Sequence, residues 1–182
     1  MQASVEQIGM DEWIQGALQS GQFHSTGQFS IDMRQALAQG IRLAAPEDFV
    51  LLLISWASQS GASRVAIRLS GGQFQLEANG QAPSLAQLDS MMQNFVLGCK
   101  TPIGTLALAM LGALQTKPRL LAIEVAEGSW TTQQIRRQPT GKNFQVRVQL
   151  GYFQSFQGVE SLLRQRCLHS HMTIELNKKK LN

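Results

Sequence analysis

The sequence has little charge, few cysteines and histidines, and no long hydrophobic run. Only 15% of its 182 residues are charged, and it contains 2 cysteines and 3 histidines. Cys99 and Cys167 fit neither a disulfide framework nor a metal-ligand spacing, and no acidic pattern accompanies His169 and His171. No segment approaches the ~18 consecutive apolar residues of a membrane span, and no basic stretch followed by an apolar run opens the chain. We therefore expect a cytoplasmic protein with reduced thiols, no bound metal and no membrane association.

The chain does have enough apolar character to form a core. With 43% hydrophobic residues, it predicts one ordinary globular domain. The net charge of +4 comes partly from the run Lys178–Lys180, which indicates a solvated tail or turn. The basic residues therefore give weak support for nucleic-acid binding, and nucleic acid is not an expected partner. The alternative is a nucleic-acid-associated domain that uses Arg136, Arg137, Lys142 and Lys178–Lys180.

Hydrophobic periodicity divides the chain into an N-terminal extension, residues 1–28, and a single domain, residues 29–182. An apolar-periodic piece of the extension runs from Met10 to Leu18. In the domain, Ser84 is a candidate helix cap, and the helix that starts at Ile103 is apolar enough to be buried nearly all round. The pattern predicts helices over 29–43, 46–60, 85–95, 103–114 and 159–167, and strands over 65–69, 73–77, 119–126, 129–136, 144–150 and 172–176.

The segment from Phe49 to Leu69 carries the most specific pattern, an apolar helix followed by Gly61-Ala62 and an alternating strand. This order resembles the GHKL ATPase superfamily, and most closely the N-terminal domain of the ninety-kilodalton heat-shock chaperones. The resemblance covers most of the chain from Phe29 onward. It implies an α+β fold, a two-layer α/β sandwich of GHKL ATPase type in which helices cover one face of a mixed sheet. Because the strand over 172–176 resembles the exit from that domain, the chain is expected to be the N-terminal part of a longer protein.

The resemblance also implies where a nucleotide site would lie. In the family, the first of these helices carries a glutamate that activates water and, one turn later, an asparagine that holds magnesium. Those two positions correspond to Leu52 and Trp56, whose side chains neither bind a metal nor move a proton. Glu47 and Asp48 lie one turn earlier, where charges in the first turn of a helix favour its dipole.

The second family motif reads adenine through an aspartate, followed by two glycines. The matching positions here are Ala78, Asn79-Gly80 and Ala82, so the carboxylate is absent. Glu77 is adjacent, but alternation along a strand should turn it to the opposite face. A family threonine near the later strand corresponds to Phe144.

The third motif is a glycine loop that leads into a helix and binds phosphate. The run Gly98–Thr105 resembles it, with Gly104 matching the last family glycine. Lys100, Thr101 and Thr105 are the candidate anion contacts, so a residual phosphate or nucleotide site remains open. The alternative is a loop that only caps the buried helix.

These substitutions predict a non-hydrolysing GHKL-like module with a degenerate nucleotide site, acting in binding, regulation or structure. No catalytic residue and no cofactor are expected. The alternative is an ATP-binding domain of a chaperone-like protein, in which ATP and magnesium would be the cofactors. The expected partner is another protein or the remaining domains of the same polypeptide, and residues 1–28 are candidates for a homodimer contact.

Overall fold

A computed structural model describes residues 46–91, 101–132, 134–152, 154–167 and 170–182. The expected extension, the predicted helix over 29–43, Cys99 and Lys100 lie outside these ranges. The described helices follow the predicted periodicity, and a short 3-10 turn, η1 (Pro46–Asp48), precedes the first of them. They are α3 (Phe49–Gln59), α4 (Leu85–Asp89), α5 (Pro102–Gln115) and α6 (Val159–Arg166).

The described strands form one mixed, eight-stranded sheet in the order β5-β4-β3-β6-β2-β1-β7-β8. Only the β1–β7 pair is parallel among these strands, and the other neighbours are antiparallel. The strands are β1 (Arg64–Ser70), β2 (Gln73–Ala78), β3 (Leu120–Val125), β4 (Gly128–Thr131), β5 (Ile135–Arg136), β6 (Phe144–Gln149), β7 (Thr173–Leu176) and β8 (Lys179–Lys180).

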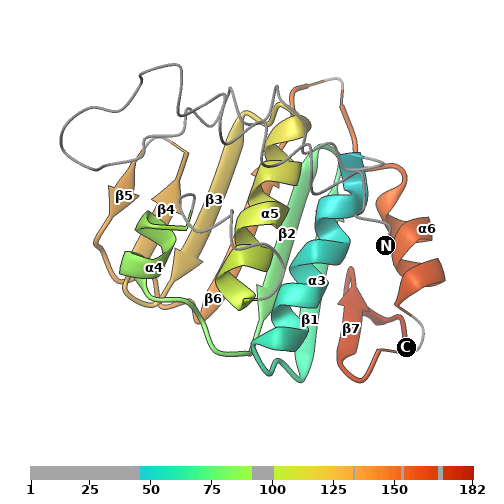
Figure 1. Cartoon of the computed structure of the whole chain (residues 1–182). Helices are drawn as coiled ribbons and strands as arrows, with labels where there is room; N and C mark the ends of the chain where they lie inside the picture. The colour runs from blue at the N-terminus through green and yellow to red at the C-terminus, as the bar shows by residue number, and fades with distance from the viewer. Residues whose placement is uncertain (1–45, 92–100, 133, 153, 168–169) are drawn as a thin grey trace, which may run out of the picture. The chain divides into compact units, whose positions relative to one another are not determined.

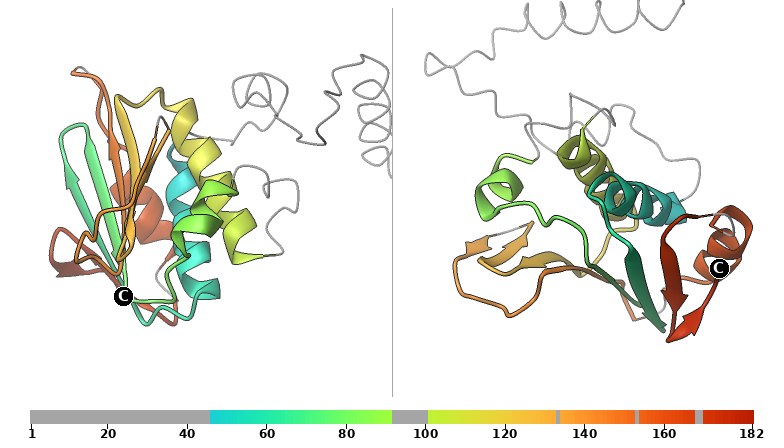
Figure 2. Two further views of the ribbon diagram at one scale, coloured as in Figure 1. Left: turned by 90° about the vertical axis from the view of Figure 1, so that its left-hand side faces the viewer. Right: turned by 90° about the horizontal axis from the view of Figure 1, so that it is seen from below.

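Helices cover one face of this sheet, which gives the predicted two-layer α+β architecture. Figures 1 and 2 show α3, α4 and α5 on the same side, with α6 at the end of the sheet that contains β7. Because side chains alternate along a strand, Val65, Leu76 and Val146 point into the layer between helices and sheet, where each is fully buried. The other face has no helix over it among the described residues.

Strand β6 joins two parts of the sheet that are separate in sequence. The β1–β2 hairpin lies on one side of it and the β3–β4–β5 meander on the other. Val146 is opposite Leu76 in one pair and opposite Ile123 in the other. A single hydrophobic core therefore extends across both parts.

Two predicted elements have different limits in the structure. Ser84 forms a capping box with Gln87, as expected of a cap, but α4 ends at Asp89 instead of continuing toward residue 95. Ser90 Oγ donates to the carbonyl of Ala86, a side-chain bond that competes with helix continuation. Of the predicted remainder, residues 92–95 lie outside the described ranges.

The strand predicted over 129–136 is in fact two strands. A turn separates β4 from β5, and the Thr131 N–H donates to the carbonyl of Gln134 at 2.9 Å. Thr131 Oγ1 also accepts from the Gln134 N–H at 3.1 Å. Side chain and backbone of the threonine thus close a turn inside a run of residues that otherwise favours extended structure.

The apolar face of the C-terminal strand is covered within the domain. Ile174 and Leu176 of β7 are buried beside β1, at 0% and 4% exposed. The basic run is also more ordered than a tail, because Lys179 and Lys180 form β8 and pair with β7. Only Lys178 lies in the turn, and all three lysines are exposed.

None of the helices in the described ranges is both long and apolar enough to cross a membrane.

We predict that Asn177 stabilises the β7–β8 hairpin in two separable ways. Its φ is +50°, which suits asparagine or glycine, and its Oδ1 accepts from the Leu69 N–H at 2.8 Å. Asn177→Gly keeps the conformation but loses the acceptor, and should cost about 1 kcal/mol of unfolding free energy. Asn177→Ala should cost about 1 kcal/mol more, because alanine is strained at positive φ. Urea unfolding measures both, and equal losses would contradict the separation.

Candidate functional site

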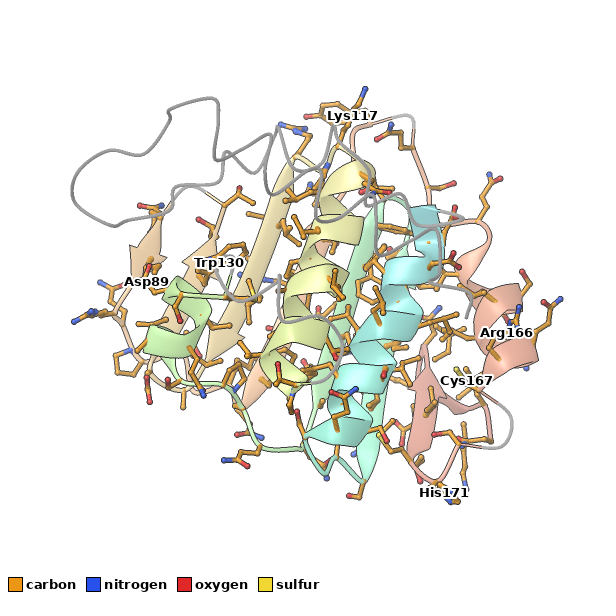
Figure 3. All side chains as sticks on the ribbon, viewed as in Figure 1. Asp89, Lys117, Trp130, Arg166, Cys167 and His171 are labelled. Atoms are coloured by element: carbon orange, nitrogen blue, oxygen red, sulfur yellow. The ribbon has the colours of Figure 1, made fainter. Side chains whose placement is uncertain are left out.

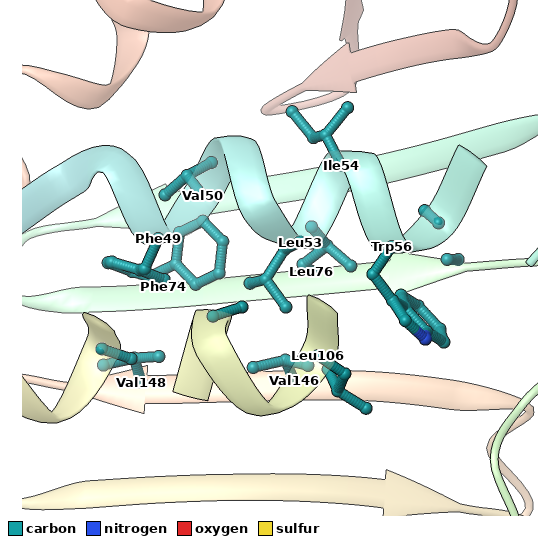
Figure 4. Close-up of a cluster of buried hydrophobic side chains, with 14 of the residues drawn as sticks. Phe49, Val50, Leu53, Ile54, Trp56, Phe74, Leu76, Leu106, Val146 and Val148 are labelled. Atoms are coloured by element: carbon teal, nitrogen blue, oxygen red, sulfur yellow. The ribbon is translucent and has the colours of Figure 1, made fainter. Parts of the chain in front are cut away.

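Trp56 stands on α3 at the position that the resemblance connects with magnesium binding. It projects from α3 toward the sheet among buried core side chains (Figure 4), and it is 1% exposed. Its ring lies 3.9 Å from the ring of Phe144, centroid to centroid, at an interplanar angle of 32°. Leu52, one turn earlier on α3, packs partly buried against the same core. Trp56 is therefore part of the hydrophobic core.

Ala78 and Glu77 lie on opposite faces of the sheet, as alternation predicts. Ala78 is 6% exposed and faces the core, so no carboxylate stands at this position on the helix side. Glu77 faces the uncovered side, where its Oε1 accepts from Gln75 at 2.8 Å and from Gln145 at 3.1 Å. The carboxylate of Glu77 therefore already has hydrogen-bond partners on the face away from the core.

Asn79 and Gly80 hold the end of β2 against the start of β1. Asn79 Oδ1 accepts from the backbone N–H groups of Ser63 and Arg64 at 3.0 and 2.9 Å. At Gly80, a Cβ would lie 2.8 Å from the carbonyl oxygen of Ser60, so any side chain there would push the backbone at Gly80 away from the backbone at Ser60. These contacts give both residues a structural role, which agrees with an ordinary turn.

The start of α5 is closed by its own side chains. Thr101 Oγ1 accepts from the Gly104 N–H at 3.2 Å and so caps the helix. Thr105 is 0% exposed, and its hydroxyl lies 3.1 Å from Gln59 Oε1, the acceptor on α3. Both hydroxyls of the phosphate-loop resemblance thus have partners within the chain, and Lys100 lies outside the described residues.

The structure brings Trp56 and Phe144 into contact, with Ala78 on the same face of the sheet. Within the described ranges, no group of three or more His, Cys, Asp or Glu residues is placed to hold a metal ion. Cys167 lies at the end of α6 near β7 (Figure 3), and burial raises the pKa of its thiol. Trp56, Phe144 and Ala78 form packed core, and their side chains can neither transfer a proton nor bind a metal ion.

A second candidate site lies on the uncovered face of the sheet, and few of its residues were predicted from the sequence. There the strands and the loop before β6 border a hollow of about 610 Å³. Its charged lining consists of Arg64, Arg68, Glu77, Lys142, Glu175 and Lys178. Of the basic residues named in the sequence as candidates for nucleic-acid binding, Lys142 and Lys178 line this hollow. Arg136 and Arg137 do not line it.

Ion pairs cross this hollow. Arg64 makes a two-pronged contact with Glu175, Nε to Oε1 at 2.9 Å and Nη2 to Oε2 at 2.7 Å. These hydrogen bonds hold the pKa of Glu175 below its ordinary value of 4.5. Lys142 Nζ lies 3.6 Å from Glu77 Oε1. A third pair on the same face joins Arg147 to Glu124.

No protein-family model matches the chain, and no curated protein matches it in a sequence comparison. The class that the structure defines is an α+β domain with a mixed sheet covered on one face by helices.

Trp56→Ala should cost about 3 to 5 kcal/mol of unfolding free energy, because it removes a fully buried ring and leaves a cavity. Tyr152→Ala is the matched aromatic control, since that side chain is 87% exposed and contacts the Arg119 guanidinium. The control should cost less than about 1 kcal/mol. Chemical denaturation followed by circular dichroism measures both free energies of unfolding. A Trp56→Ala variant with the same unfolding free energy as the parent chain would refute the filled-core interpretation.

The Arg64–Glu175 pair should make stability depend on pH in acid. A carboxyl whose pKa is lowered in the folded state stabilises that state above its unfolded pKa, and the contribution is lost as pH falls through the folded pKa. Arg64→Gln should therefore lower stability at pH 7, and its difference from the parent should shrink below pH 4.5. Urea unfolding at pH 7 and in acid tests this. Arg68→Gln, on the same strand, is the control and should show no such trend.

Proposed function

We propose that this chain is a non-hydrolysing binding, regulatory or structural module with a degenerate GHKL-type nucleotide site. The observation that carries the proposal is the stack between Trp56 and Phe144. Both residues stand at positions where the resembled ATPases have polar groups, and together they turn that region into core. The proposed setting is the cytoplasm, and the proposed partner is another protein or a further part of the same polypeptide.

Chemical requirements support the absence of hydrolysis. Attack by water at neutral pH needs a base within hydrogen-bond reach, and a magnesium site needs oxygen ligands. At the matching positions on α3, the side chains are those of Leu52 and Trp56. The Ala78 side chain offers no acceptor to an adenine amino group, and the Thr105 hydroxyl already donates to Gln59 of α3.

Calorimetric titration with ATP and magnesium tests the proposal. We expect no saturable, magnesium-dependent isotherm at micromolar concentrations and no phosphate release. Trp56→Ala forms a second arm, because it empties the ring's volume while leaving Ala78 unchanged. We expect that this variant also neither binds nor hydrolyses ATP, since a cavity alone supplies neither a general base nor an acceptor for the adenine amino group.

Saturable binding by the parent chain would replace the proposal with its alternative, an ATP-binding domain of a chaperone-like protein. Binding only by Trp56→Ala would show that filling of the site, and not loss of its polar groups, excludes the nucleotide. A folded state of that variant is verified first by circular dichroism, so that loss of structure is not mistaken for loss of binding.

A further inference from the structure

The hollow on the uncovered face has more positive than negative charge. Its lining includes the cations Arg64, Arg68, Lys142 and Lys178 and the anions Glu77 and Glu175. Each glutamate has a cationic partner, Glu175 with Arg64 and Glu77 with Lys142. Arg68 and Lys178 form no ion pair with any residue in the described ranges. An excess of two cations therefore faces solvent at this site.

The two unpaired cations lie at the same end of the hollow. Ile67 is opposite Leu176 in the parallel β1–β7 pair, so the next residues, Arg68 and Asn177, are neighbours, and Lys178 follows directly. Lys178 is held in the hairpin turn at φ +69°. Lys180 adds a further exposed cation, because it is opposite Glu175 in the β7–β8 pair and therefore shares its face.

The chemistry of this face favours carboxylates over nucleic acid. An arginine guanidinium matches the geometry of a carboxylate and binds it through two parallel hydrogen bonds. The aromatic side chains Phe74, Trp130 and Phe144 of the described strands are buried in the helix-side core, so they provide no surface for stacking bases. The excess of two charges is also small beside the roughly 6 to 10 phosphate contacts of a strong DNA-binding protein.

We propose that this hollow binds an acidic peptide segment of a protein partner, with Arg68 and Lys178 contacting its carboxylates. The inference rests on the proposed function, for which it names the chemistry of the partner. The existing ion pairs leave these two cations free for such a ligand, while they hold Arg64 and Lys142 in place along its path. Alternate residues of β1, including Arg64 and Arg68, face the uncovered side, so a short extended peptide that also advances about 3.3 Å per residue can run alongside them.

Fluorescence anisotropy with a labelled decaglutamate peptide tests the proposal on the full chain. The variant R68Q/K178G removes both unpaired charges, and glycine at 178 suits the positive φ of the turn. The control R136Q/R137Q removes the same total charge from exposed residues that do not line the hollow. We expect R68Q/K178G to weaken binding about fivefold or more and the control to change it less than twofold.

Failure of decaglutamate to bind the parent chain, or equal loss in both variants, would overturn the proposal. A labelled ten-nucleotide single-stranded DNA is the second probe, and tighter binding of DNA that is lost in R68Q/K178G would assign the hollow to nucleic acid instead. The ATP titration is independent of these outcomes. A chain that binds neither ATP nor decaglutamate would keep the proposed module and lose only its acidic partner.

Discussion

The pairing of β6 with both β2 and β3 is the constraint on which the rest of the structure depends. Without it, the β1–β2 hairpin and the β3–β4–β5 meander would each leave an open strand edge and half of a core. Pairing a strand with partners so distant in sequence carries a loop-closure cost, which the shared hydrophobic layer must offset. Once β6 is inserted, α3 and α5 pack over a continuous surface. The same insertion brings Phe144 against Trp56.

The two faces of the sheet consequently have different chemistry. On the helix side, packing leaves aromatic and aliphatic side chains in contact, and the polar groups of α5 bond within the chain. On the other side, strand alternation gathers arginine, lysine, glutamate and glutamine into paired networks around a hollow. Trp56, Ala78 and Phe144, which the resemblance connects with nucleotide chemistry, are packed in the core, whereas uncompensated charge lies on the opposite face. Recognition of a ligand is supported better there than in the core.

Three asparagine side chains fix the part of the sheet that borders the hollow. Asn79 binds the N–H groups at the start of β1, and Asn177 binds the Leu69 N–H near its end. Asn182 accepts from the Ile174 N–H of β7 at 2.9 Å. Each amide supplies an acceptor to an N–H of β1, β7 or the residue just before β1, without requiring a further strand. The charges carried by β1 and by the β7–β8 turn are therefore held on an ordered backbone, which reduces the entropy lost when a ligand binds.

The sequence determined the local elements and the burial of their apolar faces, because the periodicity of a helix or strand is written in neighbouring residues. The helix around Leu53, the alternation of β1 and the cap at Ser84 could all be predicted in this way. The break at Thr131 and the pairing of Lys179 could not, because short turn and edge contacts overrode local preference. Only tertiary structure decided that Phe144 meets Trp56 and that Arg68 lies beside the turn of Lys178. Those contacts depend on the register between distant strands, which is selected by the free energy of the whole core and not by any single segment.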